Sequence, residues 1–122
     1  MDEARITLIR SVSGRSVGEA AILTVTGVVD ATTWRATADG ILETIAVLRP
    51  PGLVVVDLAP VEFFAVAGIR LLREITTVCR RAGLQVRLSI PPESIAARVV
   101  QIAHLDETVP TFDNVHAALH LH

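Results

Sequence analysis

The sequence predicts a single α/β domain over residues 1–122, with a mixed, mainly parallel sheet of four to five strands and about four helices. Apolar runs of strand length alternate with stretches whose apolar residues recur every three or four positions, as in amphipathic helices. Strands that alternate with helices indicate a mainly parallel sheet. A chain of 122 residues, 51% hydrophobic and 20% charged, is long and apolar enough to bury one core.

Two strands joined as a hairpin are expected first, and they would make the sheet mixed. Ile6 and Leu8 alternate with polar residues, which predicts a short strand. The polar residues 11–18 include two glycines and predict the connection. The apolar run 21–26 predicts the second strand, which we expect Gly27 to close.

A helix and a buried strand are expected next. Asp30 and Thr32 are candidate N-cap residues, because short polar side chains accept hydrogen bonds from the first free amides of a helix. Residues 50–52 (Pro-Pro-Gly) are expected to stop this helix. The nearly continuous apolar run 53–58 is typical of a strand that is covered on both faces. The expected apolar stripe of the helix comprises Trp34, Ala38, Ile41, Ile45 and Leu48.

A second amphipathic helix is expected to start near Val66 and to end at Gly83, a residue type favoured just beyond a helix C-terminus. The alternating residues 84–90 then predict a more exposed strand. The residues of this helix that we expect to be buried are Gly68, Leu72, Ile75, Cys79 and Ala82.

A third and a fourth helix complete the pattern. Residues 91–93 (Pro-Pro-Glu) open the third helix, since proline and a carboxylate both suit a first helical turn. A short extended segment over 109–112 follows, and Asp113 is expected to cap a final helix that ends at Leu119. The residues of the third helix that we expect to face the core are Ile95, Val99 and Ile102.

The turn between the buried strand and the second amphipathic helix has the position of a functional site but no reactive group. The free amides and the dipole of a helix N-terminus at such a place favour anions. Here the turn reads Ala65-Val66-Ala67-Gly68, with no hydroxyl, carboxylate, thiol or imidazole. The chain also has no glycine-rich phosphate loop.

Other candidate sites have a structural interpretation that we favour. Asp30 and Asp57 follow two strands, where they could form a metal or acid/base pair, but we expect each to hold a turn or cap a helix. His116 and His120 are spaced to share a metal, yet no carboxylate or cysteine is placed to complete the shell. Cys79 lies mid-helix on the apolar stripe, as a core thiol does. We therefore expect no metal, no cofactor and no enzymatic activity.

Composition narrows the partner classes and the compartment. The net charge of −2 gives no whole-molecule attraction to nucleic acid or to an anionic membrane. The first residues do not form a signal peptide, no apolar run reaches membrane-spanning length, and the single cysteine fits a reducing compartment. We therefore expect a cytoplasmic protein. Four arginines of the second amphipathic helix form either a solvated face or a partner surface: Arg70, Arg73, Arg80 and Arg81.

Three segments together carry a signal that no single motif gives. They are LTVTGVVDATTWRATADGIL, VVVDLAPVEFFAVAGIRLL and PESIAARVVQIAHLDETVPTFDNVHAAL. They combine Gly-x-x-Asp after a hydrophobic strand, Val-Asp-Leu, and a tail with Leu-Asp followed by Pro-x-Phe. In this order, over nearly the whole chain, they resemble the STAS domain, the family of bacterial anti-sigma-factor antagonists.

The resemblance implies specific roles for the corner positions. In that family the turn normally reads Asp-Ser-Ser-Gly, and the second Ser is phosphorylated by a partner kinase that is also the anti-sigma factor. Matched position by position, Ala65 replaces the Asp, Val66 the first Ser and Ala67 the phospho-acceptor, while Gly68 is retained.

The resemblance therefore implies a STAS-like fold and a regulatory domain that binds a protein partner without phosphorylation at Ala67. The partner would be an anti-sigma factor of the serine-kinase type or another STAS protein. Asp30 and Asp57 match the acidic residues that follow the second strand and end the third. The implied partner-binding residues are Asp30, Asp57, Phe64, Ala65, Val66, Ala67, Gly68 and Arg70.

Two alternatives stay open at this point. The domain could be a small-ligand or nucleotide sensor that uses the same helix N-terminus, or a structural module that forms a homodimer. A broad exposed apolar patch at Phe63, Phe64, Val66 and Ile69 would favour a protein partner, and a concave pocket would favour a ligand.

Overall fold

A computed structural model describes the chain over residues 5–12, 19–49 and 52–120. Most of the predicted connection 11–18, and the two prolines expected to stop the first helix, lie outside the described residues. Within them, no helix is long and apolar enough to cross a membrane. The elements in chain order are β1 (Arg5–Val12), β2 (Glu19–Val29), α1 (Trp34–Ile45), β3 (Gly52–Asp57), β4 (Val61–Phe64), α2 (Ala67–Arg81), β5 (Leu84–Ser89), α3 (Ile95–Ile102), the 3-10 helix η1 (Leu105–Glu107), β6 (Thr111–Phe112) and α4 (Val115–His120).

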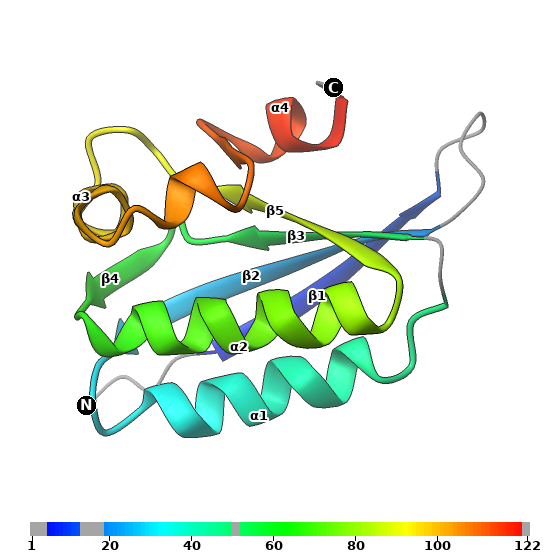
Figure 1. Ribbon diagram of the computed structural model, residues 1–122, viewed down its shortest axis with the longest axis horizontal. Helices are drawn as coiled ribbons and strands as arrows, with labels where there is room; N and C mark the ends of the chain where they lie inside the picture. The colour runs from blue at the N-terminus through cyan, green and yellow to red at the C-terminus, as the bar shows by residue number, and fades with distance from the viewer. Residues whose placement is uncertain (1–4, 13–18, 50–51, 121–122) are drawn as a thin grey trace.

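The strands form one mixed sheet with helices on both sides (Figure 1). The order is β1-β2-β3-β5-β6, and β4 pairs with β2 away from this path. β1 is antiparallel to β2, and the other pairs are parallel. α1 and α2 lie side by side on one face, α4 lies against the other, and α3 packs beside β4. The predicted α/β fold is confirmed, with one strand more than expected.

The central strand is apolar from Leu53 to Val56, and both of its faces are covered. β3 lies between β2 and β5, and Val54, Val55 and Val56 are all 0% exposed. Val54 and Val56 belong to the main core, which also holds the buried side of α1 and α2. Val55 belongs to a smaller cluster on the opposite face, with Ile22 of β2 and Ala118 of α4. The prediction of a buried central strand is confirmed.

Gly27 produces a β-bulge and a change of pairing partner, so the prediction that it closes the second strand was wrong. Its φ of 83° is one that residues with a side chain rarely adopt, and the register with β4 shifts at this point. Before the bulge β2 pairs with β3, and beyond it Val29 pairs with Phe64 of β4. The sequence predicted only a turn where β4 lies, because a segment of four residues is too short to show the alternation of apolar and polar residues that marks a strand.

The first turn of α2 rests directly on β4. Phe64 is only 1% exposed, and Gly68 faces its ring. A Cβ atom at Gly68 would lie 2.3 Å from the ring carbon Cζ, which is closer than non-bonded carbons approach. The missing side chain therefore sets how closely α2 can lie over the strand.

Two predicted helix faces need correction. Ala82 is exposed, because α2 ends at Arg81. On α3, Ile95 and Ile102 were expected to face the core but are 58% and 73% exposed, and Val99 is partly buried. The residues that α3 buries are Ala96, Ala97 and Val100. Both sets have helical spacing, and beside β4 the smaller side chains allow the helix a closer approach.

Two predictions about helix starts need correction: residues 91–93 precede α3 and do not form its first turn, and the cap of α4 is one residue beyond Asp113. Ser94 caps α3, since its hydroxyl accepts a hydrogen bond from the Ala97 amide at 3.2 Å. Asn114 and not Asp113 serves α4, because the amide of Ala117 donates to Asn114 Oδ1 at 2.8 Å. Adjacent residues of similar capping ability cannot be separated by sequence pattern alone.

Val55→Asp should unfold the chain, since it buries a carboxylate between the sheet and α4, where the neighbouring Arg87 already donates to the Ala118 carbonyl. Such burial costs several kcal/mol against a total stability of roughly 5–15 kcal/mol. Val47→Asp makes the same change at a side chain that is 64% exposed, and it should leave the thermal melt nearly unchanged. A cooperative melt of Val55→Asp close to that of the parent would contradict the placement of β3.

Gly68→Ala should destabilise the fold, although alanine normally stabilises a helix relative to glycine by up to about 1 kcal/mol. The new methyl group must displace the Phe64 ring, and overpacking of this kind costs roughly 1–3 kcal/mol. Adding Phe64→Leu relieves the clash, so the double variant should be more stable than the sum of the single changes predicts. Urea titrations of the four proteins measure this coupling. A Gly68→Ala variant as stable as the parent would show that the contact imposes no constraint.

Candidate functional site

The corner formed by Ala65, Val66, Ala67 and Gly68 lies at the junction of β4 and α2. The amide of Ala65 donates to the Val29 carbonyl at 2.9 Å, which continues the β2–β4 pairing into the corner. The amide of Gly68 donates to the Ala65 carbonyl at 2.8 Å, so the turn is tight. Val66 occupies the N-cap position, and no side chain among the described residues caps the helix. The backbone is thus well held while the usual polar cap is missing.

The outer surface of the corner is apolar. Val66 is 77% exposed and Phe63 is 48% exposed. Phe64 and Ile69 are buried, so only two of the four side chains considered for an apolar patch reach the surface. The resemblance implies a partner-binding role for Phe64, but its side chain lies beneath the corner. Phe63 reaches the surface instead, and the alternation of strand side chains could have identified its exposure, because neighbours in a strand point to opposite sides.

A cavity of about 260 Å³ lies beyond the end of β5 and next to α3. Its lining residues are Ile90, Pro92, Ala97, Val100, Gln101, Asp106, Thr111 and Asp113. None of the four corner residues is among them.

Asp30 lies next to the corner, because Val29 pairs with Phe64 in the parallel register. Its Oδ1 accepts the hydroxyl of Thr32 at 2.7 Å and the amides of Thr32 and Thr33 at 2.8 and 3.1 Å. These hydrogen bonds, led by that of the Thr32 hydroxyl, favour the ionised carboxylate and hold the pKa of Asp30 below its usual value. Asp30 thus stabilises the turn that leads into α1, and Thr32 donates to it and does not cap the helix itself.

Asp57 also holds a turn. Its Oδ1 accepts the Ala59 amide at 3.1 Å and the Ser89 hydroxyl at 3.2 Å. In the sheet register Asp57 lies opposite Thr24, six residues before Asp30 along β2. Six residues of extended chain, at roughly 3.3 Å each, separate their places in the sheet, and the two carboxylates bind different turns, so they do not form a pair. The structural interpretation of both carboxylates is confirmed.

The other chemically active residues do not assemble into a site. The rings of His116 and His120 lie 4.6 Å apart between centroids on α4. Across residues 5–12, 19–49 and 52–120, no group of three or more His, Cys, Asp or Glu side chains is placed to hold a metal ion. Cys79 is fully buried, and burial raises the pKa of its thiol to about 11, which keeps it protonated and unreactive.

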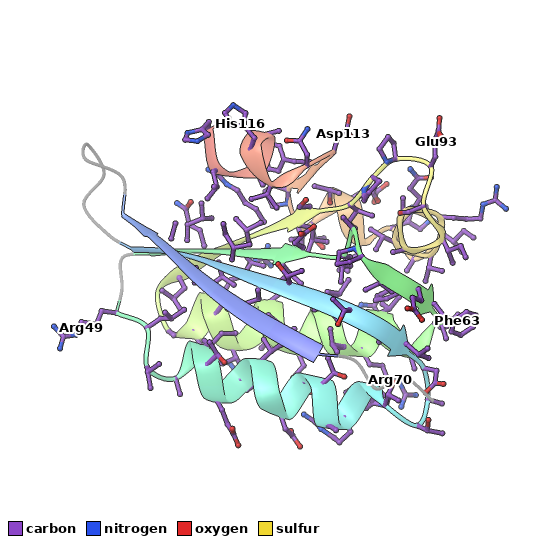
Figure 2. All side chains as sticks on the ribbon, turned by 180° about the vertical axis from the view of Figure 1, so that it is seen from behind. Arg49, Phe63, Arg70, Glu93, Asp113 and His116 are labelled. Atoms are coloured by element: carbon purple, nitrogen blue, oxygen red, sulfur yellow. The ribbon has the colours of Figure 1, made fainter. Side chains whose placement is uncertain are left out.

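Four arginines lie on the outer side of α2, and all of them are exposed: Arg70, Arg73, Arg80 and Arg81. Arg70 is one helical turn beyond Val66, and in Figure 2 it is at the same end of the molecule as Phe63. The structure therefore brings together Asp30, Arg70, Phe63 and the corner. It leaves Asp57 away from them, on the far side of the bulge.

The comparisons with known proteins agree with this architecture. The STAS domain family model matches residues 12–118. A solved anti-sigma factor antagonist from Mycobacterium paratuberculosis is similar with a TM-score of 0.66 at 24% identity, over 94% of this chain and 92% of that one. An anti-sigma-factor antagonist (STAS) domain protein from Planctomyces limnophilus is similar with a TM-score of 0.69 at 21% identity, over 97% and 96% of the two chains. No curated protein matches the chain.

At these identities the solved structures show a common fold, and the family assignment rests on the family model. The match spans most of the chain, from the end of β1 to α4, and includes β2, β3, β4 and the corner. The chain belongs to the STAS domain family.

Proposed function

We propose that this chain is a single, non-enzymatic regulatory domain that binds a protein partner through the corner, and that phosphorylation at the corner does not switch the binding. The partner is an anti-sigma factor of the serine-kinase type or another STAS protein, met in the cytoplasm. One observation carries the proposal. The corner has a tight backbone turn and an exposed apolar surface at Phe63 and Val66, and Ala67 stands where the match to the family's Asp-Ser-Ser-Gly turn places the phospho-acceptor.

A phosphate group at this position would act as a switch through its charge. It would add roughly −1.5 to −2 charges and three acceptor oxygens to a surface that a partner must desolvate. The methyl group of Ala67 cannot accept it. Thr76 and Thr77 are the hydroxyl residues of α2, and they lie roughly 14 Å further along the helix axis, at 1.5 Å per residue. Their hydroxyls donate to the backbone carbonyls of Leu72 and Arg73, so α2 offers no substitute acceptor at the corner.

The missing cap supports a role in binding. An uncapped α2 costs about 1 kcal/mol of helix stability relative to a helix with Asp or Ser at the N-cap. The apolar side chains at the corner do not offset this loss of stability within the chain, since Val66 and Phe63 are exposed and gain little from burial. A partner that covers them would gain from the burial of both side chains, by roughly 25 cal/mol for each Å² of apolar surface.

Ala67→Asp tests the proposal, because it places one negative charge where the family carries phosphate. The charge is favourable at a helix N-terminus, so the thermal melt should be unchanged or slightly higher. Binding to the anti-sigma-factor kinase encoded in the same genome should fall about tenfold or more, since the interface would have to desolvate the carboxylate. Ala46→Asp is the matched control, because Ala46 is exposed just beyond the C-terminus of α1, at the end of that helix that lies away from the corner.

Isothermal titration of the parent and the two variants with the kinase distinguishes binding through the corner from the sensor and homodimer alternatives. Loss of affinity in Ala67→Asp, with the parent's affinity in Ala46→Asp, supports the corner as the interface. An Ala67→Asp variant that folds and binds as tightly as the parent would exclude it. The sensor or homodimer reading would then replace the proposal.

A further inference from the structure

The outer side of α2 carries a continuous ridge that begins at the corner. Val66, Arg70, Arg73, Thr77 and Arg81 follow one another at intervals of four, three, four and four residues, so they lie along one side of the helix. All five are exposed. We call this set the α2 ridge. It is apolar at the corner and basic along the rest of its length, and Arg80 adds a further charge beside Arg81.

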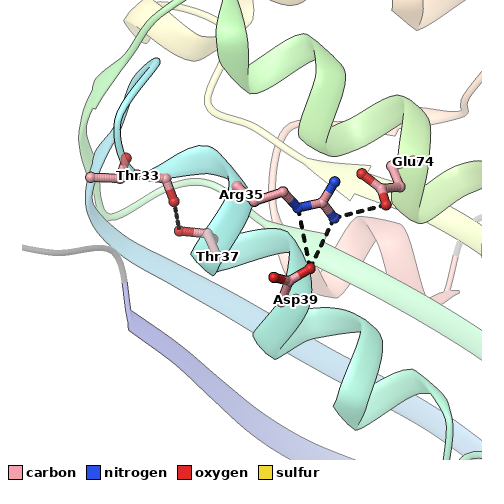
Figure 3. A network of polar contacts seen from close by, with 5 residues as sticks. All are labelled: Thr33, Arg35, Thr37, Asp39 and Glu74. Atoms are coloured by element: carbon pink, nitrogen blue, oxygen red, sulfur yellow. Dashed lines mark hydrogen bonds and ion pairs between the residues drawn. The ribbon is translucent and has the colours of Figure 1, made fainter.

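The positive charge of the α2 ridge is not balanced within the described part of the molecule. Glu74 is the one acidic residue of α2, and it pairs with Arg35 of α1 at 2.8 Å. Arg35 also holds Asp39 at 2.9 Å, so these two carboxylates are already engaged with an arginine outside the ridge (Figure 3). Among the described residues, no ion pair involves Arg70, Arg73 or Arg81. A chain with a net charge of −2 therefore presents a local row of unpaired cations.

The position of Arg70 does not serve the stability of the helix. It lies in the first turn of α2, where the helix dipole disfavours a cation. Arg73 is three residues further on, and like charges at this spacing repel each other. Arg80 and Arg81, in the last turn, do suit the dipole. The placement of Arg70 and Arg73 therefore has no evident benefit for folding and fits a surface that meets an anionic partner.

We infer that the α2 ridge docks against an acidic protein surface that places an apolar recess over Val66 and Phe63 and a row of carboxylates along Arg70, Arg73 and Arg81. From Arg70 to Arg81 the row extends roughly 16 Å along the helix axis, at 1.5 Å per residue. This inference rests on the proposed function and specifies the chemistry of the partner. A protein fits better than a nucleic acid, because the ridge begins with exposed apolar side chains and the whole chain is acidic.

The probe is a helical peptide of about 20 residues with glutamates along one face and two leucines at one end of that face, long enough to cover the ridge. Its matched partners carry glutamine or lysine in place of glutamate. The protein variants, each made in the full chain, are Arg73→Glu combined with Arg81→Glu, and Arg49→Glu as the control. Arg49 is exposed at the end of the molecule opposite Arg70 (Figure 2). Binding is measured by titration at low and at high salt.

We expect the glutamate peptide to bind the parent and Arg49→Glu equally, and to bind the double variant about tenfold more weakly at low salt. High salt and the glutamine peptide should both remove the difference. The lysine peptide should bind the double variant better than it binds the parent. NMR shifts of the labelled parent should map to the α2 ridge and Phe63. Arg70→Glu should raise the melting temperature slightly, because a negative charge is favourable at the N-terminus of the helix dipole. It should also weaken binding of the glutamate peptide, because the new carboxylate repels the glutamates.

Equal binding of the glutamate peptide by the parent and the double variant would overturn the inference. So would a duplex DNA of similar length, or anionic vesicles, binding to the parent more tightly than the peptide at the same salt. The outcome can be separated from that of the proposed function. If Ala67→Asp loses the kinase partner while the double variant keeps it, the corner is the interface and the acidic docking surface is wrong.

Discussion

The close approach of Gly68 to the ring of Phe64 is the constraint on which the rest of the corner depends. With no side chain at Gly68, α2 can begin directly over β4, and Phe64 fills the space between them. Its neighbour Phe63 must then point the other way, and Val66 is left outside the turn. β4 itself is held by the part of β2 beyond the bulge at Gly27. Two glycines and one buried aromatic ring thus fix the backbone that carries the apolar surface.

The corner has the backbone expected of the family but lacks the polar side chains that the family's turn normally carries. The tight turn, the retained Gly68 and the neighbouring Asp30 are all in place. The chain lacks the hydroxyl that would accept phosphate and the polar side chain that would cap the helix. We propose that the first difference removes regulation by phosphorylation, whereas the second lowers the stability of the helix by about 1 kcal/mol. Local sequence rules are most often broken at functional positions, so a missing cap beside an exposed apolar surface fits the proposed role in binding.

Much of the fold could be predicted because its signals are long. The run 53–58 reads as a buried strand, and the stripe of α2 is unambiguous over four turns. β4 could not be predicted, since its four residues become a strand only when β2 changes partner after Gly27. On α3, the exposed isoleucines and the buried alanines have equivalent spacing, and only packing beside β4 decides between them. Of the candidate site, sequence identified the corner and Arg70, while the separation of Asp30 from Asp57 and the exposure of Phe63 required the sheet register.

The central claim is that binding through this corner does not respond to phosphorylation. The most direct measurement is the dissociation constant of the native chain for the anti-sigma-factor kinase of the same genome, before and after incubation of the chain with that kinase, ATP and Mg²⁺. Intact mass is recorded alongside. The account predicts an unchanged mass and the same dissociation constant within about twofold, a difference of less than 1 kcal/mol. The gain of one phosphate together with affinity weaker by about tenfold or more would contradict it.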